Sequence, residues 1–140
     1  MIKLDLEKFK STAPNVVVLE LGSNDVCDSS CDAATTALSL VALTELLLSE
    51  FAIQFIVVCQ ILPRKRQPFE GYNDRVSQVN TLVRESLRDI SRTKFWNHRG
   101  LINPTTNIYC YYGIHLGDVG NRALYRSYRG AILYALAQLN

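Results

Sequence analysis

Short continuous apolar runs alternate along the chain with longer segments whose apolar residues repeat at helical spacing. The first run, NVVVLEL at residues 15–21, is rich in valine and is bounded by Pro14 and Gly22. Successive apolar residues over this length predict a short strand that is buried on both faces. The residues that follow, SNDVCDSSCDAATT at 23–36, are dense in Ser, Asn and Asp and predict a loop.

The next two predicted elements are a helix and a second strand. Residues 36–51, TALSLVALTELLLSEF, are apolar on most sides, which predicts a well-covered helix capped by Thr35 or Thr36. The second strand is expected within residues 51–62, FAIQFIVVCQIL, because Pro63 ends the run. Glutamate and glutamine residues interrupt this apolar region every few positions, so we expect no membrane span.

The second half of the chain predicts two more helices, separated by a weak strand. Residues 72–90 have the pattern of an amphipathic helix. Its apolar stripe consists of Val76, Val79, Val83, Leu87 and Ile90. Residues 94–104, KFWNHRGLINP, predict a weak strand or an extended segment, and residues 105–121 predict a loop. Asp118 can cap a last helix at residues 119–139. The stripe of this helix consists of Leu124, Tyr128, Ala131, Ala135 and Leu139.

Alternating strands and helices predict one α/β domain over residues 1–140, with a mostly parallel sheet between flanking helices in three layers. Ligands of such sheets bind outside the carboxyl ends of the strands. Residues 22–25 and 63–66 both follow predicted strands, so both are expected at the ligand-binding edge.

Composition and charge exclude several classes of protein. The chain has 140 residues, of which 48% are hydrophobic, and its net charge is only +2. This charge is too small to favour nucleic acid as a partner. The N-terminus lacks the apolar region of a secretory signal, so an intracellular location is expected. No glycine-rich phosphate-binding motif occurs, which argues against a nucleotide-binding domain, and no cofactor is expected.

The chain contains four cysteines, Cys27, Cys31, Cys59 and Cys110. Their spacing contains no C-x-x-C pair, so no metal site is expected. We expect reduced, structural thiols, although a bond between Cys27 and Cys31 remains open.

The tetrapeptide Gly22-Ser23-Asn24-Asp25 is the first candidate site. Gly22 permits a sharp turn, and the Asn24 amide at a strand end can donate a hydrogen bond to an oxyanion during acyl transfer. Asp25 is expected to hold the loop by accepting backbone N–H bonds. The alternative is an ordinary turn after a strand, because these four residue types are common in turns.

His115 is the second candidate, because a histidine in a loop at the ligand-binding edge can act as a general base. Its alternative role is to bond the loop backbone. His98, beside Trp96, is expected at the surface. PRKR at residues 63–66 could bind an anion or form a solvated loop. The aromatic segment IYCYY at 108–112 could stack on bases or sugars, but is expected to pack against the sheet.

Together, VVVLELGSND and the later GIHL before a C-terminal helix resemble the SGNH hydrolases, also called GDSL-type esterases and lipases. The resemblance implies a flavodoxin-like α/β fold. In that family, Gly-Asp-Ser carries the nucleophile, Gly-x-Asn-Asp completes the oxyanion hole, and Asp-x-x-His carries the base. By position, Gly22 and Asn24 match the oxyanion block and His115 matches the base.

Two departures from the family pattern affect the expected activity. Nothing before Gly22 reads Gly-Asp-Ser, and Ser11 does not lie in a strand-to-helix turn. The aspartate of Asp-x-x-His falls on Tyr112, a phenol that supplies no negative charge to orient His115. We therefore expect a partial, N-terminally truncated or degenerate domain, inactive or weakly active.

Two functions remain open from the sequence: a serine esterase acting on a small acyl ester, and a non-catalytic binding domain with no such substrate. A Gly-Asp-Ser block encoded upstream would favour the enzyme, whereas a true start at Met1 would favour the binding domain. A sheet that lacks its first strand exposes an edge, so self-association through that edge is also predicted.

Overall fold

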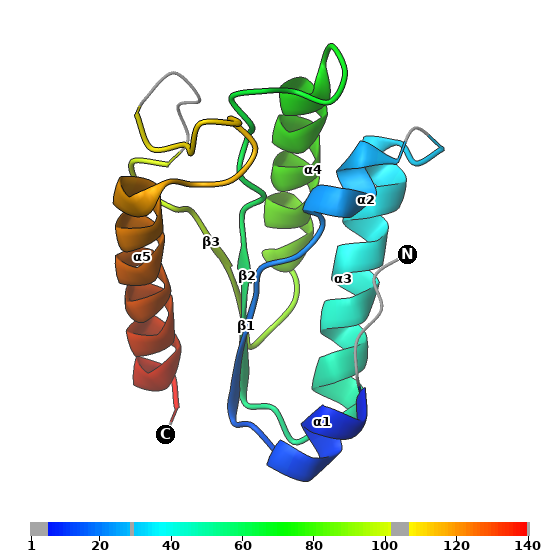
Figure 1. Ribbon diagram of the computed structural model, residues 1–140. Helices are drawn as coiled ribbons and strands as arrows, with labels where there is room; N and C mark the ends of the chain where they lie inside the picture. The colour runs from blue at the N-terminus through cyan, green and yellow to red at the C-terminus, as the bar shows by residue number, and fades with distance from the viewer. Residues whose placement is uncertain (1–5, 29, 102–106, 140) are drawn as a thin grey trace.

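One parallel three-stranded sheet forms the centre of the molecule (Figure 1). The computed structural model describes residues 6–28, 30–101 and 107–139. The strands are β1 (Val16–Leu19), β2 (Phe55–Cys59) and β3 (Thr93–Trp96), in the order β1-β2-β3. Both pairs are parallel, with Val16 opposite Phe55 and Ile56 opposite Thr93. The α/β architecture with a parallel sheet, expected from the sequence, is confirmed.

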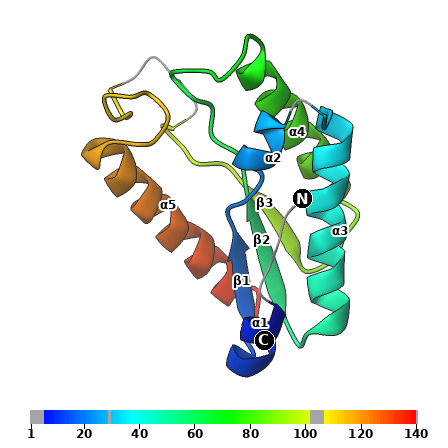
Figure 2. The same cartoon turned by 45° about the vertical axis from the view of Figure 1, so that its right-hand side comes forward.

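Helices cover both faces of the sheet, which gives three layers (Figures 1 and 2). Helices α3 (Ala33–Glu50) and α4 (Tyr72–Leu87) lie on one face, and α5 (Asp118–Ala137) lies on the other. The central strand β2 is buried along its whole length because it has a neighbour on each side and a helix layer on each face. This explains why its sequence, FIVVC, is continuously apolar.

The larger core lies between the sheet and the pair α3 and α4. The predicted α4 stripe points into it, since Val76, Val79 and Val83 are all buried. On the opposite face, Ala131 and Ala135 of α5 are fully buried against β2. Small side chains at these positions let α5 approach the sheet closely.

Three local predictions were wrong at helix ends. A short helix, α2 (Ser23–Cys27), begins within the predicted loop after β1. Helix α3 begins before Thr35, because the Asp32 carboxylate accepts a hydrogen bond from the Thr35 backbone N–H at 2.7 Å and caps the helix. Gly117, rather than Asp118, is the N-cap of α5, so the aspartate lies in the first turn. The sequence pattern also gave no signal for α1 (Leu6–Thr12).

Helix α3 is long and apolar enough, by length and composition alone, to cross a membrane. The core helix of a globular domain passes the same test. Leu40, Thr44 and Leu47 of α3 are buried against the rest of the fold, and a strand follows the helix, as the sequence predicted. The apolar character of α3 is therefore explained by its place in the core.

In the described part of the chain, β1 has one hydrogen-bonded neighbour, β2, so its other edge is unpaired. Such an edge can pair with another chain. Self-association through β1 stays a prediction.

Two neighbouring leucines of α3 test this account of the core. Leu47 is fully buried, whereas Leu46 is 42% exposed. Leu47→Ala should lower the free energy of unfolding by about 2–5 kcal/mol, because it leaves a cavity. Leu46→Ala should change it by no more than about 0.5 kcal/mol. Urea denaturation measures both, and equal losses would show that Leu47 is not in a packed core.

Candidate functional site

A cavity of about 720 Å³ opens where the carboxyl ends of β1 and β2 meet the start of α5. Its walls come from residues 20–25 and 28 after β1, residues 61–64 after β2, residues 109 and 114–116, and the first turns of α5. Asn24 and His115, far apart in the sequence, both line this cavity. The fold thus brings together the two side chains that sequence analysis selected for acyl transfer.

Gly22 fixes the direction in which the chain leaves β1. Its φ of +105° lies in the left-handed region, which favours glycine. A Cβ atom here would lie 2.7 Å from Cδ1 of Ile61 and 3.3 Å from Cδ1 of Leu40. Glycine is therefore required both for the turn and for close packing, and the turn places Asn24 in the first turn of α2, exposed to the cavity.

Ser23 also lines the cavity, but its neighbours cannot activate it. The Arg64 guanidinium donates a hydrogen bond to Ser23 Oγ at 3.0 Å, and the Tyr72 hydroxyl lies 3.3 Å from the same atom. Burial raises the pKa of Tyr72, so this phenol stays neutral. A serine needs an adjacent base to become nucleophilic, and neither partner is one.

A tight hairpin holds His115 on the cavity wall. Tyr109 and Leu116 form an antiparallel bridge, and the Cys110 N–H donates to the His115 carbonyl at 2.9 Å. The hairpin is fixed to the loop after β2 because the Arg66 N–H donates to the Gly113 carbonyl at 2.8 Å. The backbone of His115 is thus anchored, while its side chain is exposed.

Tyr112 lies at the tip of this hairpin and is 66% exposed. Its ring packs against Tyr111, which is 97% exposed, and Tyr112 is not among the described residues that line the cavity. The prediction that residues 108–112 pack against the sheet was wrong for these two tyrosines, because the turn directs them outward.

The loop after β2 contributes one cation to the cavity. Asn73 fixes the backbone of Arg64, accepting from its N–H at 2.8 Å and donating to its carbonyl at 2.9 Å. Arg64 is half-buried, whereas Lys65 and Arg66 are exposed. Asp25 lines the cavity as well, and its expected role in holding the loop stays a prediction.

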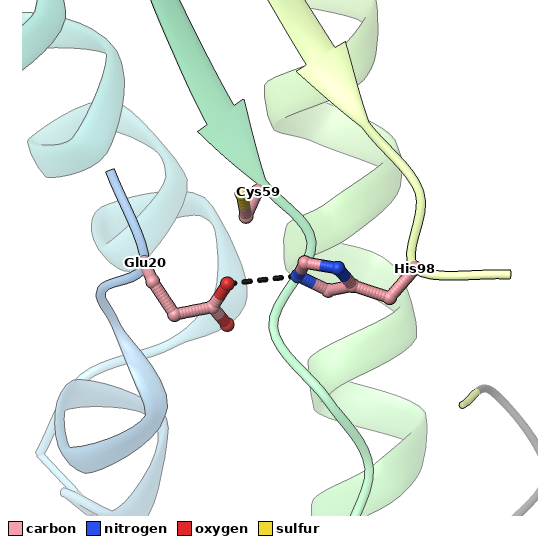
Figure 3. Close-up of side chains that lie close together, drawn as sticks. All are labelled: Glu20, Cys59 and His98. Atoms are coloured by element: carbon pink, nitrogen blue, oxygen red, sulfur yellow. Dashed lines mark hydrogen bonds and ion pairs between the residues drawn. The ribbon is translucent and has the colours of Figure 1, made fainter. Parts of the chain in front are cut away.

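Sequence analysis missed a buried polar network beside the cavity (Figure 3). His98, expected at the surface, is fully buried. Its Nε2 lies 2.8 Å from the Glu20 carboxylate, and its Nδ1 lies 2.7 Å from Ser127 Oγ. The polar neighbours of His98 in the sequence concealed its burial, whereas its place just after a strand was the available signal.

Ser127 does not supply a nucleophile to the Asn24 cavity. The order carboxylate, imidazole, hydroxyl is that of a serine hydrolase triad. However, Ser127 Oγ also accepts a hydrogen bond from the Trp96 indole at 3.0 Å. It lines a separate cavity of about 690 Å³ with Lys94, Arg99 and Arg126, away from Asn24 and His115.

All four cysteines are free, so the open question of a bond between Cys27 and Cys31 is answered. Cys59 is buried at the end of β2, and the other three are partly buried. Burial, reinforced by the nearby Glu20 charge, raises the pKa of the Cys59 thiol, which is therefore protonated at neutral pH.

Comparison with known proteins gives the family. The family model for GDSL-like lipase/acylhydrolase matches residues 3–127, most of the chain. The chain belongs to this family. The resemblance to SGNH hydrolases is thus confirmed. No curated protein is significantly similar to the chain.

Two solved structures share the fold of this GDSL-family chain. A GDSL-like lipase from Bacteroides thetaiotaomicron is 19% identical with a TM-score of 0.75, over 92% of this chain and 67% of the lipase. A Streptococcus pneumonia protein, described as a platelet activating factor, is 18% identical with a TM-score of 0.66, over 84% of this chain. This chain spans 59% of that second structure.

Comparing alanine variants of Gly22 and Gly71 distinguishes the cost of backbone strain from the cost of steric overlap. Gly22 and Gly71 are both N-caps with positive φ, but a Cβ at Gly71 would have no atom within 4 Å. Gly71→Ala should cost about 1–2 kcal/mol of unfolding free energy from backbone strain alone. Gly22→Ala should cost about 1–3 kcal/mol more, because Ile61 is buried and its methyl can give way only by displacing core atoms. Urea denaturation of the two variants tests this difference, and equal losses would contradict the overlap.

Proposed function

We propose that the cavity is the acyl-ester site of a GDSL-family serine esterase, retained in a chain that lacks the nucleophile block. The observation that carries this proposal is that Asn24 and His115 line one cavity at the carboxyl ends of the strands. Its volume, about 720 Å³, lies within the range of about 300–1,000 Å³ found for small-molecule sites.

In this proposal Asn24 and His115 have different roles. The Asn24 side-chain N–H₂ donates to the oxygen on which negative charge develops when an ester carbonyl is attacked. In the full family form, the histidine at the position of His115 takes the proton from a nucleophilic serine, which this chain does not supply, and later gives it to the leaving alcohol. The half-buried Arg64 guanidinium adds positive charge to the same wall, which favours an anionic intermediate.

Hydrolysis by this chain alone is proposed to be weak or absent. Ser23 lacks a base, and Tyr112 neither faces the cavity nor carries a charge that would stabilise protonated His115. Serine hydrolases that lack a triad member still accelerate hydrolysis about 10³- to 10⁴-fold over water, through substrate binding and the oxyanion hole alone.

A second candidate function is a non-catalytic domain that binds an ester or carboxylate in the same cavity. The occupation of Ser23 Oγ by Arg64 and Tyr72 favours it, because that arrangement suits a fixed polar wall better than a nucleophile.

Labelling with a fluorophosphonate probe tests whether the chain contains an activated serine. The folded chain should carry no adduct by intact mass, because in our proposal no serine of the cavity has an adjacent base. Circular dichroism confirms folding, an active serine esterase serves as the positive control, and Asn24→Ala is treated in parallel. A single adduct that disappears on denaturation and maps to one serine would contradict the missing nucleophile.

Binding of a short-chain alkyl phosphonate monoester tests the cavity itself, because this anion mimics the tetrahedral intermediate. It should shift the NMR signals of the Asn24 amide and the His115 ring. Asn24→Ala should weaken binding about 10- to 100-fold, the value of one hydrogen bond to a charged group.

Asn15→Ala is the matched control, because this asparagine lies at the opposite end of β1. Its affinity should equal that of the unmodified chain. Equal affinity for Asn24→Ala, or no binding by the folded chain, would overturn the proposed site.

A further inference from the structure

Side chains of three types that can bind metal ions meet where the three strands end (Figure 3). Glu20 directly follows β1, Cys59 is the last residue of β2, and His98 comes two residues after β3. One potential ligand atom from each lies within 4.8 Å of those of the other two. Parallel pairing produces this convergence, because it places the carboxyl ends of neighbouring strands side by side.

We propose that Glu20, Cys59 and His98 form a zinc-binding site. A thiolate, an imidazole and a carboxylate are together the ligands that Zn²⁺ accepts, and three protein ligands with one open position is a common arrangement for it. Mg²⁺ and Ca²⁺ are disfavoured because they prefer oxygen ligands.

Contacts around His98 orient its ring for this role. Ser127 Oγ lies 2.7 Å from Nδ1, which leaves Nε2 pointing at Glu20 and the ligand cluster. The His98 backbone N–H donates to the Gln60 side chain at 3.1 Å, and the Tyr128 ring packs edge-on against the imidazole. Metal-bound histidines are commonly held in this way, by a hydrogen bond on the other ring nitrogen.

Charge and protons balance when Zn²⁺ enters the cluster. In the free protein, the carboxylate of Glu20 can only accept, so a neutral His98 carries its proton on Nε2 and donates it to Glu20. When zinc binds, this proton moves to Nδ1, where Ser127 Oγ accepts it. The Cys59 thiol releases one proton to solvent and forms the Zn–S bond as a thiolate. Zn²⁺ with one thiolate and one carboxylate has no net charge, so the bound cluster buries no unpaired ion.

The fourth position is open to water. Cys59 and His98 are buried, but the Glu20 side chain is 33% exposed and lines the cavity that contains Asn24. An ion can therefore enter past Glu20, and a water molecule from the cavity can complete the tetrahedron.

Titration of the purified, metal-free chain with Zn²⁺, and with Co²⁺ as a spectroscopic substitute, tests the site. We expect one ion per chain by native mass spectrometry, and a thiolate-to-cobalt charge-transfer band. Between pH 7 and 8 the affinity should rise about tenfold, since one thiol proton is released for each ion bound.

Variants assign the ligands. Cys59→Ala should abolish the charge-transfer band, and Glu20→Gln, which keeps an acceptor for His98, should weaken binding at least about tenfold. Ser127→Ala should weaken it about 10- to 100-fold, as loss of a partner of a metal-bound histidine does. The triple variant Cys27→Ala, Cys31→Ala, Cys110→Ala is the matched control and should bind like the unmodified chain.

Three results would overturn the proposal. The first is no stoichiometric binding by the folded chain. The second is a charge-transfer band that persists in Cys59→Ala but is lost in the triple variant, which would show binding by the other cysteines. The third applies if Cys59→Ala does not fold: an unchanged zinc affinity in Glu20→Gln would then overturn the proposed site.

Discussion

The parallel pairing of β1, β2 and β3 is the constraint on which the remaining structure depends. Because all three strands run in one direction, their carboxyl ends lie at one edge of the sheet, and every loop that leaves them starts there. The oxyanion candidate Asn24, the cation Arg64 and the buried His98 all follow strand ends. Their proximity is a consequence of the sheet, rather than of any local sequence pattern.

The helices that cover the sheet hold this edge in place. Helices α3 and α4 bury one face of the sheet and α5 buries the other, so the strand ends are held by packing on both sides. Helix α5 also carries residues into two polar sites: its first turns line the cavity with Asn24 and His115, and Ser127 fixes the His98 ring. Close contact of α5 with β2, through Ala131 and Ala135, is therefore a condition for both sites.

The two polar sites next to each other differ in how they are built. Asn24 and His115 of the cavity are exposed, and Gly22 and the Gly113 hairpin fix the backbone beside them. Side chains of the Glu20–His98 network are mostly buried, so their hydrogen bonds must be satisfied within the protein. In an exposed site of the first kind, water can hydrogen-bond a side chain that has no protein partner. The buried ring of His98 has no such alternative, because an unpaired buried imidazole costs free energy.

The sequence by itself determined the elements with clear periodicity and the family. The stripes of α4 and α5, the apolar β2 and the Gly-x-Asn-Asp and His blocks could all be read from neighbouring residues, because periodicity and turn chemistry are local. Tertiary structure alone decided that His98 is buried, that Ser23 Oγ is hydrogen-bonded to Arg64 and Tyr72, and that Tyr112 is exposed and does not line the cavity. It also decided that Glu20, Cys59 and His98 meet. Linear spacing could not show this, because each of these residues ends a different strand and whole helices separate them in the chain. Only the parallel sheet brings them within reach of one another.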